Sequence, residues 1–538
     1  MSTSPDVSVI IPVYNAEEYI ERCLDSVVGQ TLGLDRMQVL VVDDGSTDSS
    51  PALIDAFAKA HPAFEVIRRP VASGGPATPR NLALERVRGR YVFFLDQDDY
   101  LSADALETMI GTADHNHTDI VLARMKGTGG RNTPRPMFTR TIPRTDVFST
   151  PSIYWVLNPI KLFRTDLVRR LGVGMRPDFQ LGEDLEFVAT AYFKADGISI
   201  IADKDYIFWV NREDSSNITL SAVALSERLP AASHMVDLVA AAVPPGPARD
   251  ALMRRHFHIE FMMRVFPAYL REPDPAARAA AFARFREIVA SCYTDRIAEA
   301  YAPQGRVLVH LIASDREGDF SAYLQALAEA GGPPDVVTED GRVLVALPWF
   351  RDPAHGLPDA LFDITSQLKV ECRIGPLDVG PTGIGFPATC RLSALSDRIT
   401  GVSLVARPRH GSGDAVLPLA FEVMFDEINP YARVRDEVPL EWLFALPKGE
   451  VHDLHLRVCA GDTTRDRKAA ECALILRPRV LRGAGKASGM RGVLTMTPRS
   501  YLSFCATGRA GLIARLLEHY ARTGAWMLRE RMMRSMRR

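Results

Sequence analysis

The sequence predicts an α/β domain with a mostly parallel sheet, followed by a helical region and a C-terminal, immunoglobulin-like β-sandwich. Three observations predict this order. Strand patterns alternate with helices near the N-terminus, apolar residues then recur at helical spacing, and short β-rich runs separated by turn clusters follow. The expected domains are residues 1–220, 221–335 and 336–505, and a basic amphipathic tail covers 506–538.

The first domain alternates apolar runs of strand length with amphipathic helices. We expect strands at residues 7–13 and in the runs MQVLVVDD, AFEVIRR and YVFFL, and helices at 17–29 and in RNLALERVRG. Strands that alternate with helices of about 10 to 15 residues form βαβ units, whose ligands bind at the carboxyl ends of the strands. Acidic clusters at 43–44 and 96–99 follow two of these strands, so the sequence predicts a ligand site there.

Composition narrows the class of protein. A net charge of −2 gives no general attraction to nucleic acid. No apolar stretch reaches the roughly 18 residues of a spanning helix, and the N-terminal segment lacks the basic region of a signal peptide. The seven cysteines are scattered without zinc or disulfide spacing. These features predict a cytoplasmic protein that does not bind nucleic acid.

The last segment, 506–538, carries eight arginines against two glutamates amid leucines, methionines and a tryptophan. Basic residues near an anionic membrane surface each contribute about 1 kcal/mol to binding. We expect peripheral contact with the inner face of the plasma membrane. A basic face that packs on the protein's own acidic surface is the alternative.

A D-x-D tripeptide, Asp96-Gln97-Asp98, stands at the end of a predicted strand. Alternate side chains of a strand share a face, so the two carboxylates can converge. Magnesium typically binds one or two carboxylates together with substrate phosphates. For an isolated tripeptide, a turn with solvated aspartates is the alternative, but here other motifs accompany it.

Four segments stand in the order and spacing of one enzyme family: VSVIIPVYNAEEYIERCLDSVVGQT, VLVVDDGSTDSS, SGGPATPRNLALERVRGRYVFFLDQDDYL and LGEDLEFVATAYF. The first 220 residues therefore resemble the inverting family 2 glycosyltransferases, which have the GT-A fold. The resemblance implies a nucleoside-diphosphate sugar donor. It implies that Pro12, Tyr14 and Asp43 border the nucleobase and ribose, with Asp44 close by.

The resemblance also assigns the residues around the sugar and the diphosphate. Arg80 and Asn81 flank the nucleotide pocket, and Asp96 reaches the ribose or the sugar. Asp98 holds a divalent metal, magnesium or manganese, on the diphosphate. A cation there stabilises the departing diphosphate.

Asp184, in the tripeptide Gly-Glu-Asp, matches the position of the family's catalytic base. Inverting transfer needs one base to accept the proton of the acceptor hydroxyl, and Glu183 can bind near the donor and tune that base. The start of a helix favours the ionised form of Asp184, whereas apolar neighbours and Glu183 oppose it, so the net change in pKa stays open. The alternative is that Asp184 only caps the helix.

One departure from the family concerns the metal. Many relatives use a histidine after the base region as a further metal ligand, but no histidine occurs between Asp184 and His234. Arg212 is the candidate that neutralises the diphosphate instead. A surface ion pair is the equally weighted alternative for Arg212. The strictness of metal dependence is therefore an open question.

The layout of the whole chain resembles the bacterial poly(ribitol phosphate) N-acetylglucosaminyltransferases of wall teichoic acid, with LPDALFDITSQLKVECRI and TPRSYLSFCATG as the most similar C-terminal segments. This implies transfer of N-acetylglucosamine from UDP-GlcNAc to a polyol-phosphate or polysaccharide acceptor. The helical and β regions would bind the polymer or form a homo-oligomer. The alternatives are a transferase of capsular polysaccharide or glycolipid synthesis, and a non-catalytic glycan-binding scaffold.

Overall fold

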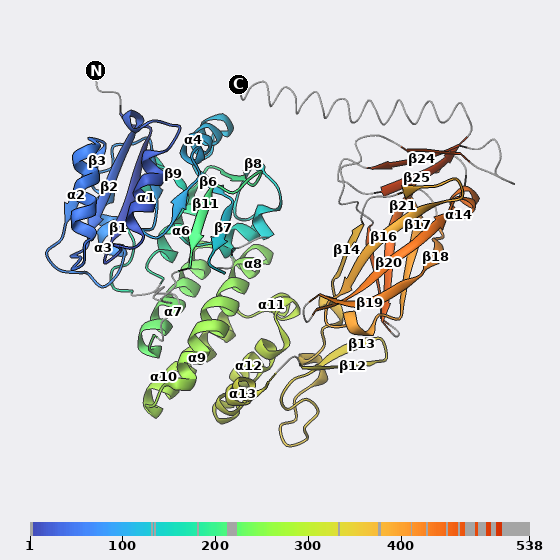
Figure 1. The fold of residues 1–538 in the computed structure, drawn as a ribbon. Helices are drawn as coiled ribbons and strands as arrows, with labels where there is room; N and C mark the ends of the chain where they lie inside the picture. Colours follow the sequence, from blue (N-terminus) through green and yellow to red (C-terminus); the bar gives the residue numbers. More distant parts are fainter. Residues whose placement is uncertain are drawn as a thin grey trace. The chain divides into compact units, whose positions relative to one another are not determined.

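The chain folds into two compact units, residues 1–329 and 330–538 (Figure 1). The computed structural model describes residues 4–130, 133, 136–179, 182–211, 223–331, 334–374, 378–409, 412–426, 429–447, 450–460, 463–468, 479–482, 491–496 and 502–507. The predicted helical region therefore shares a unit with the α/β domain. The boundaries of the four predicted domains stay predictions.

An eight-stranded sheet with the order β3-β2-β1-β4-β9-β6-β10-β8 forms the centre of the first unit. β1 (Val7–Val13) lies between β2 (Met37–Asp43) and β4 (Tyr91–Phe94), and it is parallel to both. β2 is also parallel to β3 (Phe64–Arg68). Every residue of β1, β2 and β4 is buried. Strands buried on both faces are continuous apolar runs, which is why the sequence predicted them correctly.

The other half of the sheet contains strands that the sequence did not predict. β9 (Leu162–Arg164) runs antiparallel to both β4 and β6 (Ile120–Ala123). β10 (Ile198–Ile201) is parallel to β6, and β8 (Ile142–Thr145) is antiparallel to β10. A three-stranded sheet of β5 (Tyr100–Leu101), β11 (Ile207–Val210) and β7 (Met125–Thr128) follows the D-x-D. The mostly parallel α/β fold is confirmed.

Six helices connect these strands: α1 (Ile20–Val28), α2 (Ser50–Ala60), α3 (Ala77–Leu84), α4 (Ala105–Asn116), α5 (Thr165–Leu171) and α6 (Leu185–Lys194). Short 3-10 turns lie at η1 (Leu34–Arg36), η2 (Pro136–Thr139) and η3 (Pro151–Trp155). The helix predicted in RNLALERVRG begins earlier, at Ala77, because Pro79 fits a first helical turn. It ends before Gly89, where a Cβ would lie 2.4 Å from the nitrogen of Ser8.

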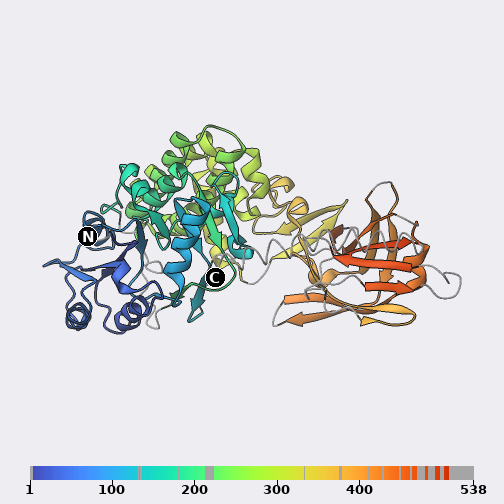
Figure 2. The same cartoon turned by 90° about the horizontal axis from the view of Figure 1, so that it is seen from above.

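The predicted helical region is confirmed, and it contains α7 (Leu225–Ala242), α8 (Pro247–Arg255), the π-helix η5 (His256–Val265), α9 (Phe266–Arg271), α10 (Pro275–Cys292), α11 (Asp295–Ala300), α12 (Pro303–Ala313) and α13 (Glu317–Glu329). These helices gather beside the α/β domain (Figure 2). Glu186 of α6 accepts a hydrogen bond from His234 of α7 at 2.8 Å, and Tyr154 contacts His256 at 3.0 Å. Among the described residues, no helix is long and apolar enough to cross a membrane.

The second unit is rich in strands, as predicted. A hairpin of β12 (Asp335–Glu339) and β13 (Arg342–Ala346) comes first, with 3-10 turns at η6 (Asp359–Leu361) and η7 (Thr365–Gln367). One sheet contains β14 (Val370–Ile374), β15 (Asp378–Val379), β16 (Gly383–Leu392), β19 (Phe421–Asp426) and β20 (Asn429–Pro439).

The second sheet contains β17 (Gly401–Pro408), β18 (Ala415–Leu419), β21 (His452–Ala460), β22 (Thr463–Lys468), β23 (Arg479–Arg482), β24 (Arg491–Met496) and β25 (Leu502–Thr507). The turn η8 (Ser396–Arg398) and the helix α14 (Leu440–Ala445) link strands. Alternate residues of β16 and β21 are buried, and side chains of both sheets join one apolar core. Two sheets that share a core form a β-sandwich. The arginine-rich tail from residue 508 lies outside the described residues.

Candidate active site

Tyr14 lies at the carboxyl end of β1, between the two acidic clusters that the sequence singled out. Its backbone is fixed by Gln97, the middle residue of the D-x-D. The nitrogen of Tyr14 donates to Gln97 Oε1 at 2.7 Å, and Gln97 Nε2 donates to the carbonyl oxygen of Tyr14 at 3.1 Å. Tyr14 is nonetheless 47% exposed. This arrangement suits an aromatic ring that contacts a planar ligand.

Asp43 and Asp44, at the end of β2, are both buried, and each pairs with a different arginine. Arg68 donates to Asp43 Oδ2 at 3.3 Å. Arg69 forms an ion pair with Asp44 Oδ1 at 2.5 Å, and the nitrogen and hydroxyl of Ser73 donate to Asp44 Oδ2 at 2.9 and 2.6 Å. Asp44 therefore anchors the loop that leads to α3. Asp43, with its longer ion pair, is the carboxylate better placed to exchange a partner for a ligand.

Arg80 of α3 joins the D-x-D to the predicted base. Its side chain is 4% exposed, and it donates to Asp96 Oδ1 at 2.6 Å and to Glu183 Oε1 at 2.9 Å. Burial by itself would lower the pKa of Arg80, but Asp96, Glu183 and Asp184 outweigh burial and raise it. Arg80 is thus a permanent cation that two carboxylates share. Its predicted direct contact with a nucleotide, and that of Asp96, stay predictions.

Asn81 positions the segment that precedes α6 through two hydrogen bonds to the backbone of Met175. Its carboxamide donates to the carbonyl oxygen of Met175 at 2.8 Å and accepts from the nitrogen of Met175 at 2.9 Å. The nitrogen of Arg176 then donates to the carbonyl oxygen of Glu183 at 2.8 Å. Gly182 has a φ of +83°, a conformation that other residues rarely adopt. Both polar groups of the Asn81 side chain are engaged in positioning this segment, and its predicted role beside the nucleotide stays a prediction.

Asp184 is the N-cap residue of α6, but its side chain makes no capping hydrogen bond. The residue as a whole is partly exposed, and its carboxylate is not used to cap the helix. Burial is the main factor that raises the pKa of Asp184, whereas Arg80 and Lys161 oppose this change. Burial and the neighbouring Asp184 likewise raise the pKa of Glu183, against the effect of Arg80. A base whose pKa rises toward neutrality accepts a proton more readily.

Asp98, the predicted metal ligand, is 7% exposed. The described residues include no group of three or more His, Cys, Asp or Glu side chains that could hold a metal ion. Magnesium can use one or two carboxylates and take further oxygens from substrate phosphates, so Asp98 fits a cation that arrives with a diphosphate. Arg212, the predicted partner of the diphosphate, lies outside the described residues.

Two contributors to the site were missed from the sequence. Gln97 carried no signal beyond its place inside the D-x-D. Lys161 stands in the apolar run NPIKLF, where a single lysine before a strand gave a faint signal. It is 1% exposed. Both residues act across contacts that are distant in sequence, such as the 83 residues between Gln97 and Tyr14.

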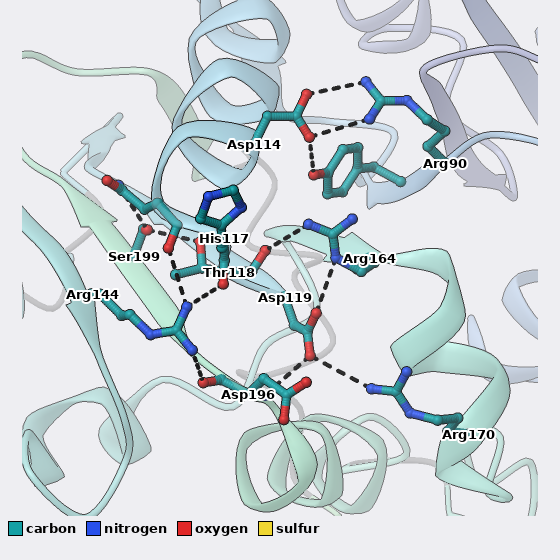
Figure 3. Close-up of polar contacts among 12 residues, drawn as sticks. Arg90, Asp114, His117, Thr118, Asp119, Arg144, Arg164, Arg170, Asp196 and Ser199 are labelled. Atoms are coloured by element: carbon teal, nitrogen blue, oxygen red, sulfur yellow. Dashed lines mark hydrogen bonds and ion pairs between the residues drawn. The ribbon is translucent and has the colours of Figure 1, made fainter.

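The opposite edge of the sheet carries a different charged cluster (Figure 3). Asp119, just before β6, accepts from Arg164 at 3.0 Å and pairs with Arg170 at 3.6 Å. Asp114 accepts from Arg90 at 3.1 and 3.2 Å. Each of these carboxylates pairs with at least one arginine, and Arg90 also pairs with Asp6 at 2.8 Å. The cluster therefore ties elements together at the amino ends of the parallel strands, and nothing in it resembles a ligand site.

The D-x-D after β4 and the Asp184 carboxyl group at the start of α6 accompany a mostly parallel sheet, and such sheets bind ligands at the carboxyl ends of their strands. Residues 8–176 match the family described as glycosyl transferase family 2, and residues 229–324 match the glycosyl transferase TarS linker domain. The N-terminal part of the chain is thus a family 2 glycosyltransferase domain, followed by a linker domain of the TarS kind. The predicted enzyme class is confirmed.

The similar proteins include two that are named as poly(ribitol-phosphate) transferases. The poly(ribitol-phosphate) beta-glucosyltransferase of Bacillus spizizenii is 39% identical over 207 residues, which are 38% of this chain and 32% of that protein. TarS of Staphylococcus aureus MW2, a poly(ribitol-phosphate) beta-N-acetylglucosaminyltransferase, is 35% identical over 206 residues, 38% of this chain and 36% of TarS. The matched region therefore spans about a third of these relatives.

Solved structures extend the likeness to most of the chain. The structure of S. aureus TarS covers 94% of this chain and 85% of TarS, with a TM-score of 0.62 and 21% identity. This confirms the predicted succession of an α/β domain, a helical region and strand-rich sheets. The structure of TarS 1–349 in complex with UDP-GlcNAc covers 66% of this chain and 98% of that chain, with a TM-score of 0.55 and 25% identity.

Proposed function

We propose that the protein transfers N-acetylglucosamine, with inversion, from UDP-GlcNAc to a hydroxyl of a polyol-phosphate polymer such as a teichoic acid. The observation that carries the proposal is the carboxylate of Asp184, which makes no capping hydrogen bond and interacts with Arg80 and Asp96 beside the D-x-D. The named activities of the poly(ribitol-phosphate) relatives and the TarS complex with UDP-GlcNAc support the donor and the acceptor.

The donor would bind across the carboxyl ends of β1, β2 and β4. Pro12 and the exposed ring of Tyr14 would contact the nucleobase, and Asp43 would receive hydrogen bonds from the base or the ribose. Asp98 would bind magnesium or manganese together with the diphosphate, and this ion supplies positive charge for the leaving group. Asp96, held by Arg80, would face the ribose or the sugar.

Asp184 would accept the proton of the acceptor hydroxyl as the hydroxyl oxygen bonds to the anomeric carbon. The bond from that carbon to the diphosphate breaks at the opposite face, and UDP leaves with the electron pair. The raised pKa of Asp184 improves its strength as a base. Glu183 would orient the site through Arg80, because its carboxylate already accepts from that guanidinium at 2.9 Å.

A release assay tests this function. The protein would be incubated with UDP-GlcNAc or UDP-glucose, with and without poly(ribitol phosphate), in magnesium or manganese, and free UDP would be measured. UDP-glucose is the second candidate donor because the relative from B. spizizenii is a glucosyltransferase. We expect polymer-dependent release from one donor. Absence of release from either donor, with no thermal shift by UDP, would overturn the proposal and favour a glycan-binding scaffold.

The β-sandwich would engage the acceptor or assemble homo-oligomers, since the candidate site lies wholly in the first unit. The proposal places the reaction in the cytoplasm, with the basic tail at the inner face of the plasma membrane. A truncated protein that ends at residue 331 should bind UDP-GlcNAc normally yet transfer poorly to long polymer. Equal transfer by both lengths of chain, measured as polymer-bound label, would disprove a role in acceptor binding.

A further inference from the structure

Cys372 and Cys390 lie directly opposite each other on neighbouring strands of the second unit. β14 runs antiparallel to β16, and the register pairs Glu371 with Arg391 and Cys372 with Cys390 (Figure 1). The Cys372 thiol donates to Cys390 Sγ, and the two sulfur atoms are 3.3 Å apart. The residues are 18 apart in the sequence, a separation that matches no cysteine motif. The register of the sheet is therefore what brings the two thiols together.

The geometry of this pair suits a disulfide bond. Residues opposite each other in an antiparallel pair have Cα atoms about 4.5 or 5.5 Å apart, and disulfides join Cα atoms that are about 4.4 to 6.8 Å apart. The sulfur atoms already lie 3.3 Å from each other. A disulfide of about 2.05 Å therefore needs only a change in the side-chain torsion angles, and the strand pairing can stay intact.

The two thiols differ in their access to solvent. Cys390 is 0% exposed and belongs to the apolar core that the two sheets share, whereas Cys372 is partly exposed and packs against that core. β14 also lies at the edge of its sheet, in the order β14-β16-β20-β19. A reagent from solvent can therefore reach Cys372 first. An accessible thiol beside a second thiol that resolves its product is typical of redox-sensitive cysteines.

We propose that Cys372 and Cys390 are a redox-sensitive pair that forms a reversible disulfide between β14 and β16. The oxidant is a small-molecule disulfide, for which glutathione disulfide is the probe. A reducing compartment keeps the pair as thiols, and a rise in the oxidant converts it to the disulfide. This modification site lies in the second unit and does not depend on the proposed transferase activity.

The reaction consists of two exchange steps. The Cys372 thiolate attacks one sulfur of glutathione disulfide, which forms a mixed disulfide and releases one glutathione thiolate. The Cys390 thiolate then attacks the sulfur of Cys372, and the second glutathione leaves with the electron pair of the broken bond. The two cysteines together lose two protons and two electrons, and glutathione disulfide gains them as two glutathione thiols. Excess dithiothreitol reverses both steps.

Mass spectrometry of the full chain tests the pair. The folded protein would be incubated with glutathione disulfide, alkylated, and digested without reduction. We expect two peptides linked through Cys372 and Cys390, which dithiothreitol separates. A mixed disulfide that persists on Cys372 without linked peptides, or a link from either residue to another cysteine, would overturn the proposal.

Three substitutions test the order of attack. Cys390→Ala should trap the mixed disulfide on Cys372, because the resolving thiol is gone. In Cys372→Ala the buried Cys390 should stay unmodified, and circular dichroism would show that each variant is folded. Cys459→Ala is the matched control, because Cys459 is a partly exposed cysteine of the other sheet, opposite Gly401 and Thr464. This control should form the link between Cys372 and Cys390 as the parent does.

Thermal unfolding gives a second readout. A disulfide constrains the unfolded chain, so the oxidised parent should have a Tm about 3 °C or more above that of the reduced parent. Cys390→Ala treated in the same way should show no such rise. Linkage that forms in urea but not in the folded protein would overturn the proposal, because the folded sheet would then not hold the two thiols within reach.

Discussion

The amino ends and the carboxyl ends of the strands in the central sheet both carry charged residues but arrange them differently. At the amino ends of the strands, Arg90 and Tyr91 lower the pKa of Asp114 although partial burial opposes them (Figure 3). At the carboxyl ends, burial raises the pKa of both Glu183 and Asp184, and Arg80 offsets this only in part. At the amino ends, paired charges stabilise the fold. At the carboxyl ends, the pKa values of two buried carboxyl groups are raised, which costs stability but suits a group that must accept a proton.

Among the substitutions that test this contrast, replacement of Arg80 should have the largest effect. Arg80→Met would leave Asp96 and Glu183 without their shared cation, and breaking a buried ion pair typically costs about 3 to 5 kcal/mol. We expect urea unfolding to show a loss of that size together with loss of turnover. Arg164→Met at the opposite edge is the control, because its side chain is 30% exposed. Equal losses of stability in the two variants would contradict the difference proposed between the two ends of the strands.

The second largest effect is expected when the predicted metal ligand, Asp98, is removed. Asp98→Ala should lower turnover by about 10²-fold or more, as loss of several kcal/mol of charge stabilisation implies. Chelation should inhibit the parent protein, and added manganese or magnesium should restore it. Calorimetry of UDP with and without metal would check binding apart from turnover. Full activity of Asp98→Ala in chelator would show that the metal does not bind there.

The smallest effect concerns Asp114. Its pKa in the folded state is lowered, so its charge adds stability above its unfolded pKa, and that stability is lost as pH falls through the folded pKa. Because the side chain is 42% exposed, solvent screening reduces the gain, and Asp114→Asn should cost less than about 1 kcal/mol at pH 7. The deficit should shrink below about pH 4. A deficit that does not change with pH would show that the cost is steric.

The sequence predicted the half of the sheet formed by β3, β2, β1 and β4 well, and the half from β9 to β8 poorly. β1, β2 and β4 are continuous apolar runs, whose pattern is local. β9 and β8 have three and four residues and antiparallel partners, and such short segments carry no periodic signal. The α-helical and β-rich regions were predictable because their patterns persist over many residues.

The candidate site was predictable in its residue types but not in its connections. Motif order placed Asp96, Asp98 and Asp184, whereas the ion pair of Arg80 with Glu183 spans 103 residues and has no local signature. The sequence also left open whether Asp184 caps its helix and in which direction its pKa moves. Both depend on the burial of the carboxylate and on distant cations, which only the three-dimensional arrangement supplies.

The most direct test of the account compares the two neighbouring carboxyl groups at the start of α6. Asp184→Asn keeps the shape of the side chain but removes the basic oxygen, and Glu183→Gln does the same at the residue paired with Arg80. Turnover and calorimetric binding of UDP-GlcNAc would be measured for both.

We predict that Asp184→Asn lowers turnover by about 10²- to 10⁴-fold with nearly unchanged donor affinity, and that Glu183→Gln has a smaller effect. Turnover of Asp184→Asn within about threefold of the parent, beside an inactive Glu183→Gln, would contradict the account and identify Glu183 as the base.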